Sequence, residues 1–320
     1  MNIKNLIPTN IGSDGIDRRG FLKCMGWAGT AVVCSVSGGI LTSRALADAL
    51  ANPGAIAAAE LNFVQISDSH IGFNKAANKN VIGTFQEAVN RINALPTAPE
   101  FLLHTGDLTH LSQPDEFDTV EQVLTASRAS KTFYVPGEHD VMSDNGAQYL
   151  ERFGKGTLGS GWYSFDQKGV HFIGLVNVIG KTELSMGHLG PDQLAWLQKD
   201  LAALSSSTPI VVFAHVPLWE IYPQWGWGTD DGAKALQLLK GFGSVTVLNG
   251  HIHQQMQKIE GNMTFHTARS TAFPQPAPGT APKPGPKVVP AEELRRTLGL
   301  TSVNYTEVDH HLAIIDSTLA

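Results

Sequence analysis

Five short polar blocks, each at the end of an apolar run, bring together the residue types that metal chemistry needs. They are SDSH (67–70), TGD (105–107), GEHD (137–140), AH (214–215) and NGHIH (249–253). Carboxylates and imidazoles without thiolates suit zinc, manganese or iron. Two such ions about 3.5–4 Å apart polarise a phosphate group and generate hydroxide near neutral pH. The candidate donors are Asp68, His70, Asp107, Glu138, His139, His215, His251 and His253.

The elements that must position these blocks are strands. From residue 61 the chain alternates apolar runs, which predict buried strands, with stretches of helical spacing near 80–94, 115–128, 191–204 and 231–240. In open α/β sheets the loops at the strand exits converge over one edge. We therefore expect one α/β domain over residues 61–320, with strands and helices in layers and the blocks meeting at one edge.

Residues 274–290 interrupt this alternation. The segment holds seven of the chain's 17 prolines, which predicts an extended surface loop with polyproline character. We expect a strap across the surface, with a lid over a site or a docking strip for a partner as alternatives. Beyond residue 256 the pattern indicates a hairpin that turns at Gly261-Asn262, and HHLAIIDS (310–317) predicts a last strand.

The first 47 residues have the layout of a signal peptide. An arginine pair precedes a weakly apolar stretch with several Gly and Ser residues, and ALA (45–47) fits an A-x-A cleavage site. RRGFLK (18–23) resembles the twin-arginine export signal, whose export machinery generally carries folded proteins. We expect export to the periplasm or beyond, a linker over 48–60, and no permanent membrane span in the mature chain, because the stretch is rich in Gly, Ser and Thr.

Charge and cysteine usage exclude several functions. The net charge is -6, and residues 1–47 hold five basic and two acidic side chains, so the remainder carries -9. An acidic body argues against general nucleic-acid or anionic-membrane binding, because few cations would neutralise the phosphates. Phosphate recognition then needs a local positive source, such as a metal. Both cysteines, Cys24 and Cys34, precede residue 48, so the body has no thiolate ligand or nucleophile.

The order of the blocks, D-x-H, G-D, G-x-H-D, H and G-H-x-H, resembles the calcineurin-like metallophosphoesterases between residues 68 and 253. GDLT (106–109) is similar to their cyclic-nucleotide phosphodiesterase-like branch. The resemblance implies a two-sheet β-sandwich flanked by helices. It also implies a first metal held by Asp68, His70 and His253, a bridging Asp107, and a second metal held by His215, His251 and residue 138.

Within the same resemblance, His139 faces the phosphate as an acid or charge stabiliser, and Asp140 orients it. The residues themselves indicate the same roles, because a neighbouring carboxylate fixes an imidazole ring and favours imidazolium.

Position 138 departs from the family, which has an asparagine there. Glutamate brings an anionic oxygen one methylene further out and no N–H donor. Formally, this third carboxylate cancels the positive charge left by two divalent ions, a hydroxide and two aspartates. We consider three interpretations. Glu138 ligates, with a trivalent iron paired with Mn or Zn; it turns away or acts as a base; or the scaffold no longer hydrolyses phosphate.

The loop after His215, VPLWEIYPQWGWGTDDG (216–232), is expected to border the pocket. Its aromatic residues Trp219, Trp225 and Trp227 either stack on an aromatic or apolar part of the substrate or pack the loop onto the body. Arg269 is expected to reach the substrate. His110 is assigned to the surroundings of the ligands or the surface, and His104 to the core.

Together these features predict an exported, metal-dependent phosphoester hydrolase in which metal-bound hydroxide attacks phosphorus in line. Phosphodiesters are slightly favoured, by analogy through GDLT alone. The alternative is a non-catalytic, metal-dependent binding module on the same scaffold.

Overall fold

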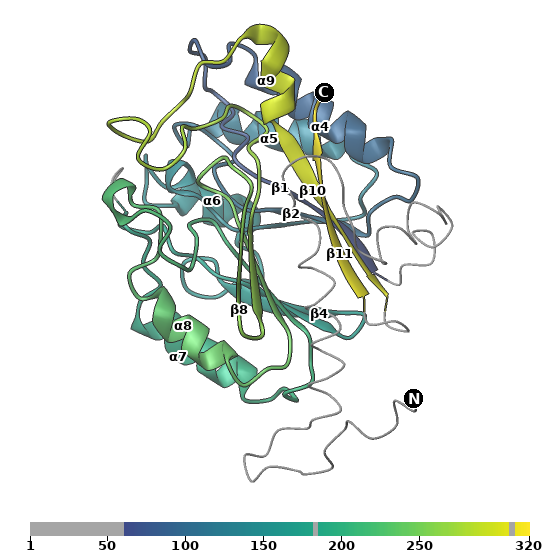
Figure 1. The fold of residues 1–320 in the computed structure, drawn as a ribbon, viewed down its shortest axis with the longest axis vertical. Helices are drawn as coiled ribbons and strands as arrows, with labels where there is room; N and C mark the ends of the chain where they lie inside the picture. The colour runs from purple at the N-terminus through teal and green to yellow at the C-terminus, as the bar shows by residue number, and fades with distance from the viewer. Residues whose placement is uncertain (1–60, 182–184, 307–310) are drawn as a thin grey trace, which may run out of the picture.

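The structure, a computed structural model, describes residues 61–181, 185–306 and 311–320. Two mixed β-sheets pack face to face, and helices cover both outer sides (Figure 1). The expected α/β fold, a two-sheet sandwich flanked by helices, is confirmed. The predicted signal peptide and linker lie outside the described residues.

The first sheet has its three parallel strands at one edge and an antiparallel pair at the other. Its central strand β1 pairs in parallel with β2 and antiparallel with β10. In spatial order the strands are β11 (His311–Thr318), β10 (Gly299–Thr306), β1 (Leu61–Ile66), β2 (Phe101–His104) and β3 (Thr132–Tyr134).

The second sheet has four parallel strands between two antiparallel edge strands. Its last two strands form the predicted hairpin, in which Gly261 adopts a φ of +60° at the turn. In spatial order the strands are β4 (Tyr163–Gln167), β5 (Val170–Gly174), β6 (Ile210–Ala214), β7 (Val245–Asn249), β9 (Met263–Thr267) and β8 (Met256–Glu260).

Aromatic residues fill the space between the sheets. Phe63 of β1 and Phe101 of β2 each lie 5.4 Å, ring centre to ring centre, from Phe172 of β5, in edge-to-face geometry. Side chains alternate along a strand, so Val64 and Ile66 of β1 belong instead to the core beneath the outer helices. Because both faces of β1 are buried, its apolar residues lie on both sides of the strand.

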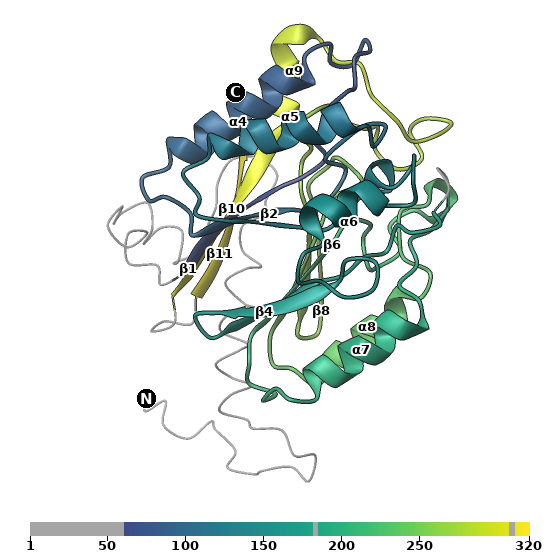
Figure 2. The same cartoon turned by 180° about the vertical axis from the view of Figure 1, so that it is seen from behind.

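The helices lie in two layers outside the sheets. Helix α4 packs its apolar stripe, Phe85, Val89 and Ile92, onto the first sheet at the spacing of an amphipathic helix. Figure 2 shows α4 and α5 on one side of the strands and α7 and α8 on the other. The bounds are α4 (Val81–Asn93), α5 (Pro114–Thr125), α6 (Ala147–Phe153), α7 (Pro191–Leu201), α8 (Gly232–Leu239) and α9 (Ala291–Thr297).

The four predicted helices are confirmed, whereas α6, α9, β4 and β10 were not predicted. Residues 274–290 contain no helix or strand, as their prolines indicate. The predicted last strand is β11. Among the described residues, no helix is both long enough and apolar enough to cross a membrane.

Candidate metal centre

The polar blocks all leave their strands at one edge of the sandwich, where both sheets contribute. Among these donors only Glu138 is more than marginally exposed, at 15% of its side chain. The donors, by strand, are Asp68 and His70 (β1), Asp107 (β2), Glu138 (β3), His215 (β6), and His251 and His253 (β7).

Five of these donors hold a left-handed backbone, with φ between 41° and 70°: Asp68, His70, Asp107, His251 and His253. Such conformations are costly for residues with a Cβ and persist where surrounding structure enforces them, often at functional sites. Here the loops enforce them on each other, because the Asp68 amide donates to Gly106 O at 3.0 Å and the His70 amide to Asp107 O at 2.9 Å.

Two glycines permit the close approach of the loops. A Cβ on Gly137 would lie 2.0 Å from Asp107 Oδ1, and a Cβ on Gly250 would lie 2.0 Å from Ser67 Oγ. Any larger residue would push a donor out of place.

The first donor set consists of Asp68, His70 and His253. His253 Nε2 lies 3.2 Å from Asp68 Oδ1 and 3.1 Å from His70 Nε2. Asp107 Oδ2 lies 3.5 Å from His70 Nε2, at the border of this set.

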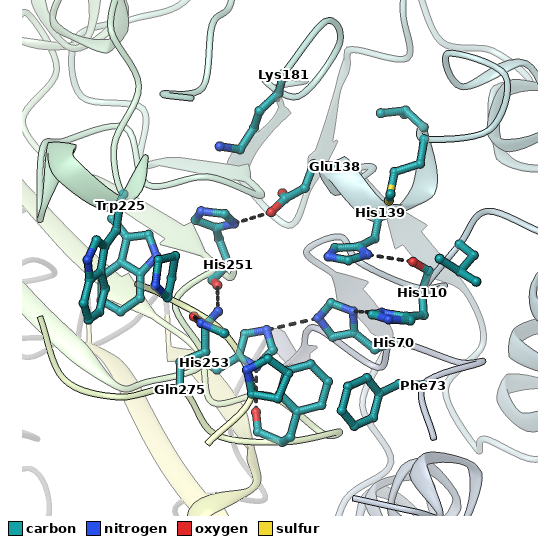
Figure 3. Close-up of a pocket in the computed structure, with 18 of the residues that line it drawn as sticks. His70, Phe73, His110, Glu138, His139, Lys181, Trp225, His251, His253 and Gln275 are labelled. Carbon is teal, nitrogen blue, oxygen red and sulfur yellow. Dashed lines mark hydrogen bonds and ion pairs between the residues drawn. The ribbon is translucent and has the colours of Figure 1, made fainter. Parts of the chain in front are cut away.

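The second donor set consists of Glu138, His215 and His251. Glu138 places Oε2 3.0 Å from His215 Nε2. Its Oε1 lies 2.9 Å from His251 Nδ1, as Figure 3 shows. Asp107 Oδ2 is 3.3 Å from His215 Nε2, so one carboxylate oxygen reaches both sets. Glu138 therefore does not turn away from the site, so that half of the second interpretation is wrong, and its other half, a role as a base, stays a prediction.

Backbone carbonyls fix the tautomer of two imidazoles. His215 Nδ1–H donates to Thr105 O at 2.7 Å, and His253 Nδ1–H donates to Phe273 O at 2.6 Å. A carbonyl only accepts, so in the neutral form of each ring Nε2 keeps its lone pair for the cluster. This is the usual support for a metal-binding histidine.

The donor sets fit metal ions. Glu138 Oε2, His215 Nε2 and both ring nitrogens of His251 are buried without a hydrogen bond, although most buried polar atoms have one. Within each set the ligand atoms lie within 4.8 Å of one another. This holds for Asp68 with His70 and His253, and for Glu138 with His215 and His251.

The electrostatics favour ionised Asp68 and Glu138 but divide the imidazoles. Burial lowers the pKa of His215, yet Asp107 and Glu138 outweigh it and raise that pKa well above its usual value. Burial raises the pKa of Asp68, but His253 and His215 outweigh it and lower the pKa to about 2. Burial likewise opposes His251 and His215 at Glu138, whose pKa is held well below its usual range. Burial lowers the pKa of His70 far below its usual value, which leaves its nitrogen lone pair available for a cation.

His139 lines the cavity, but Asp140 does not bond to it. The His139 Nδ1–H donates to His110 O at 2.7 Å, which leaves Nε2 for the cavity (Figure 3). The buried Asp140 carboxylate accepts from the amides of Gly137 at 2.8 Å, Leu108 at 3.1 Å and Thr109 at 2.8 Å. The expectation that Asp140 orients the ring is wrong, because the turn at Glu138–Asp140 directs its carboxylate back to the preceding loop.

A cavity of about 680 Å³ opens over the donors. Its wall includes Pro284, Gly285 and Pro286 of the strap, so residues 274–290 border the site as well as the surface. Gln275 ties the strap down: its Nε2 donates to His251 O, and its Oε1 accepts from the Gly285 amide, both at 2.9 Å.

The structure divides the predicted substrate residues. Trp225 and Trp227 line the cavity and pack on one another, with ring centres 5.1 Å apart. Trp219 packs on Phe265 in the core outside the cavity wall. Arg269 also lies outside that wall, where it donates to the carbonyls that end α9. The assignments of Trp219 and Arg269 to the substrate are wrong, because neither side chain turns to the cavity: Trp219 packs into the core, and Arg269 points to the end of α9.

Sequence reasoning missed Lys181, Phe273 and Gln275, which line the cavity outside the polar blocks. Gln275 at the start of the proline-rich segment was the one available signal. His110 lies beside the ligands as expected, with Nδ1 3.5 Å from His70 Nδ1, and His104 is buried.

This fold and donor cluster define a metal-dependent phosphoesterase. Residues 61–255 match the family described as calcineurin-like phosphoesterase, which is more than half of the chain. The chain belongs to this family and is a metal-dependent phosphoester hydrolase.

Two curated relatives mark its place in the family. The chain is 24% identical to a 3',5'-cyclic-nucleotide phosphodiesterase of Nostoc sp., over 67% of this chain and 79% of that protein. It is 30% identical to the human serine/threonine-protein phosphatase CPPED1, over 42% of this chain and 45% of that protein.

Two solved structures share the fold. A dimetal phosphatase from Danio rerio matches 82% of this chain and 100% of its own, with a TM-score of 0.54 and 16% identity. A purple acid phosphatase from yellow lupin seeds matches 81% of this chain and 51% of its own, with a TM-score of 0.57 and 13% identity.

Proposed function

We propose that this protein is an exported dinuclear-metal phosphoesterase that prefers phosphodiesters. The observation that carries the proposal is the sharing of Asp107 Oδ2 between two buried donor sets. The similarity to the Nostoc cyclic-nucleotide phosphodiesterase supports the diester preference. The anionic Glu138 in the second set supports a trivalent iron there, with Mn or Zn in the first.

Bound ions supply Lewis-acid activation of the phosphate and a nucleophile at neutral pH. His139 protonates the departing oxygen through Nε2, while His110 O holds its other ring nitrogen. Burial lowers the pKa of His139, but Asp107 and Glu138 outweigh it, so the raised pKa favours the proton-bearing form that an acid needs. Trp225, backed by the fully buried Trp227, offers an apolar wall to the alcohol part of the substrate.

The test is an assay of protein purified without chelators, with metal content measured on the same sample. We expect faster hydrolysis of an aryl phosphodiester than of its monoester, and a loss of at least about 100-fold in Asp107→Asn. Folded Asp107→Asn with full activity would contradict the proposal. Wild-type protein that binds metal and hydrolyses neither ester would favour the binding module.

Export rests on RRGFLK at residues 18–23. Fractionation of cells that express the full chain is expected to place it outside the cytoplasm and to retain the Arg18→Lys, Arg19→Lys double variant inside. Equal distribution of the two proteins would remove the export part of the proposal.

A further inference from the structure

Three carboxylates meet at the metal centre, and Glu138 is the one that faces the cavity. It lines the cavity wall and approaches both His215 and His251. An anionic phosphate that enters here meets an additional negative charge and no N–H donor from position 138. With two divalent ions and a hydroxide the centre is formally neutral, and with one trivalent ion it carries a single positive charge, so a cation on the same side strengthens its attraction for an anionic phosphate.

Lys181 is placed to be that cation. Only two of the residues that line the cavity are lysines or arginines, Lys75 and Lys181. Lys181 follows Gly180, whose φ is +74°, in the loop after β5, and Figure 3 draws its ammonium on the side of Glu138 and His251. Lys75 lies on the opposite, His110 side and is exposed.

The surroundings of Lys181 keep its ammonium group beside the metal centre. Its Nζ donates to Ser185 O, which anchors the long side chain. Burial lowers the pKa of Lys181 below its usual value, and Glu138 and Asp107 only partly offset this, so the ammonium lies within the field of both carboxylates. An ammonium has three donors and is a compact point charge, which suits a phosphate oxygen.

We propose that Lys181 binds the substrate phosphate beside the second donor set and restores the positive charge that Glu138 removes. The proposal rests on the proposed phosphoesterase function and deepens it. Glu138 and Lys181 then act as a pair: each alone unbalances the site, and loss of both leaves the formal charge unchanged. Because a charge-assisted hydrogen bond is directional as well as strong, arginine should replace Lys181 better than a neutral residue.

The experiment measures binding of inorganic phosphate to the metal-loaded protein by calorimetry, with metal content determined for each variant. Lys181→Met should weaken phosphate binding roughly tenfold to a hundredfold, as expected for one charge-assisted hydrogen bond. Lys181→Arg should remain within about threefold of wild type. Glu138→Asn should bind phosphate more tightly, and Glu138→Asn with Lys181→Met should return close to the wild-type affinity.

Lys75→Met is the matched control, because it removes the same charge from the same cavity on the side away from Glu138. Because Lys75 is exposed and screened by solvent, its loss should change phosphate affinity by less than about threefold, and Glu138→Asn with Lys75→Met should keep the tighter binding of Glu138→Asn. Unchanged phosphate affinity in Lys181→Met at full metal content would overturn the inference, as would a double variant no better than Lys181→Met alone. Both of these outcomes concern phosphate affinity alone and do not depend on whether the protein hydrolyses an ester. Wild-type protein that binds phosphate through Lys181 and hydrolyses no ester would instead remove the proposed function.

Discussion

At the scale of single residues, Asp140 shows how adjacency misleads. Its position after His139 indicates a carboxylate that orients the ring, yet the ring bonds to His110 O. Asp140 instead accepts four hydrogen bonds, three from amides and one from Thr109 Oγ1 at 2.8 Å. It holds the loop that carries Asp107 against the loop that carries Glu138.

We therefore expect Asp140→Asn to act first on stability. The amide keeps one acceptor oxygen and turns an NH2 towards buried donors, so the free energy of unfolding should fall by about 2–4 kcal/mol. Urea unfolding measures this, with Asp144→Asn on the neighbouring loop as the control, where the change should stay below about 1 kcal/mol. A fully stable Asp140→Asn variant with impaired turnover would reinstate the orienting role.

At the scale of elements, the sequence predicts well the position of residues that directly follow a strand. A ligand at a strand exit is located as soon as the strand is found, so His70, Asp107, His215 and His251 were all placed from apolar runs. The path of a long loop, and therefore the direction of its side chains, does not follow from the position of the preceding strand. The loop after β6 returns Trp225 and Trp227 to the cavity but leaves Trp219 on the core.

The same limit applies to residues that reach the site from loops without polar blocks. Lys181 follows β5 in a stretch that reads as the end of a strand, and no spacing rule connects it with Glu138. The short helices α6 and α9, of seven residues each, were missed because fewer than three turns carry little periodicity. The strap at 274–290 was predicted as a loop, but only its tertiary contact through Gln275 locates it over the centre.

At the scale of the whole molecule, the metal centre joins the two sheets. The first donor set combines loops after β1 and β7, and the second combines loops after β3, β6 and β7. Metal ions bound here cross-link the sandwich at one edge. Without them, three carboxylates face one another in a site shielded from water, where like charges repel more strongly than in solvent.

Chelation should therefore lower the stability of the whole domain. A ligand at a hundred times its Kd stabilises the folded state by about 2.7 kcal/mol, and each kcal/mol shifts Tm by about 2–4 °C at this size. We expect EDTA treatment to lower the Tm by at least about 5 °C and metal addition to restore it, because a preformed site is rare in the unfolded chain. Asp107→Asn, which lacks the shared oxygen of both sets, is the matched comparison and should show a smaller shift. If metal analysis confirms removal of the ions and the wild-type Tm does not move, the centre does not hold the two sheets together.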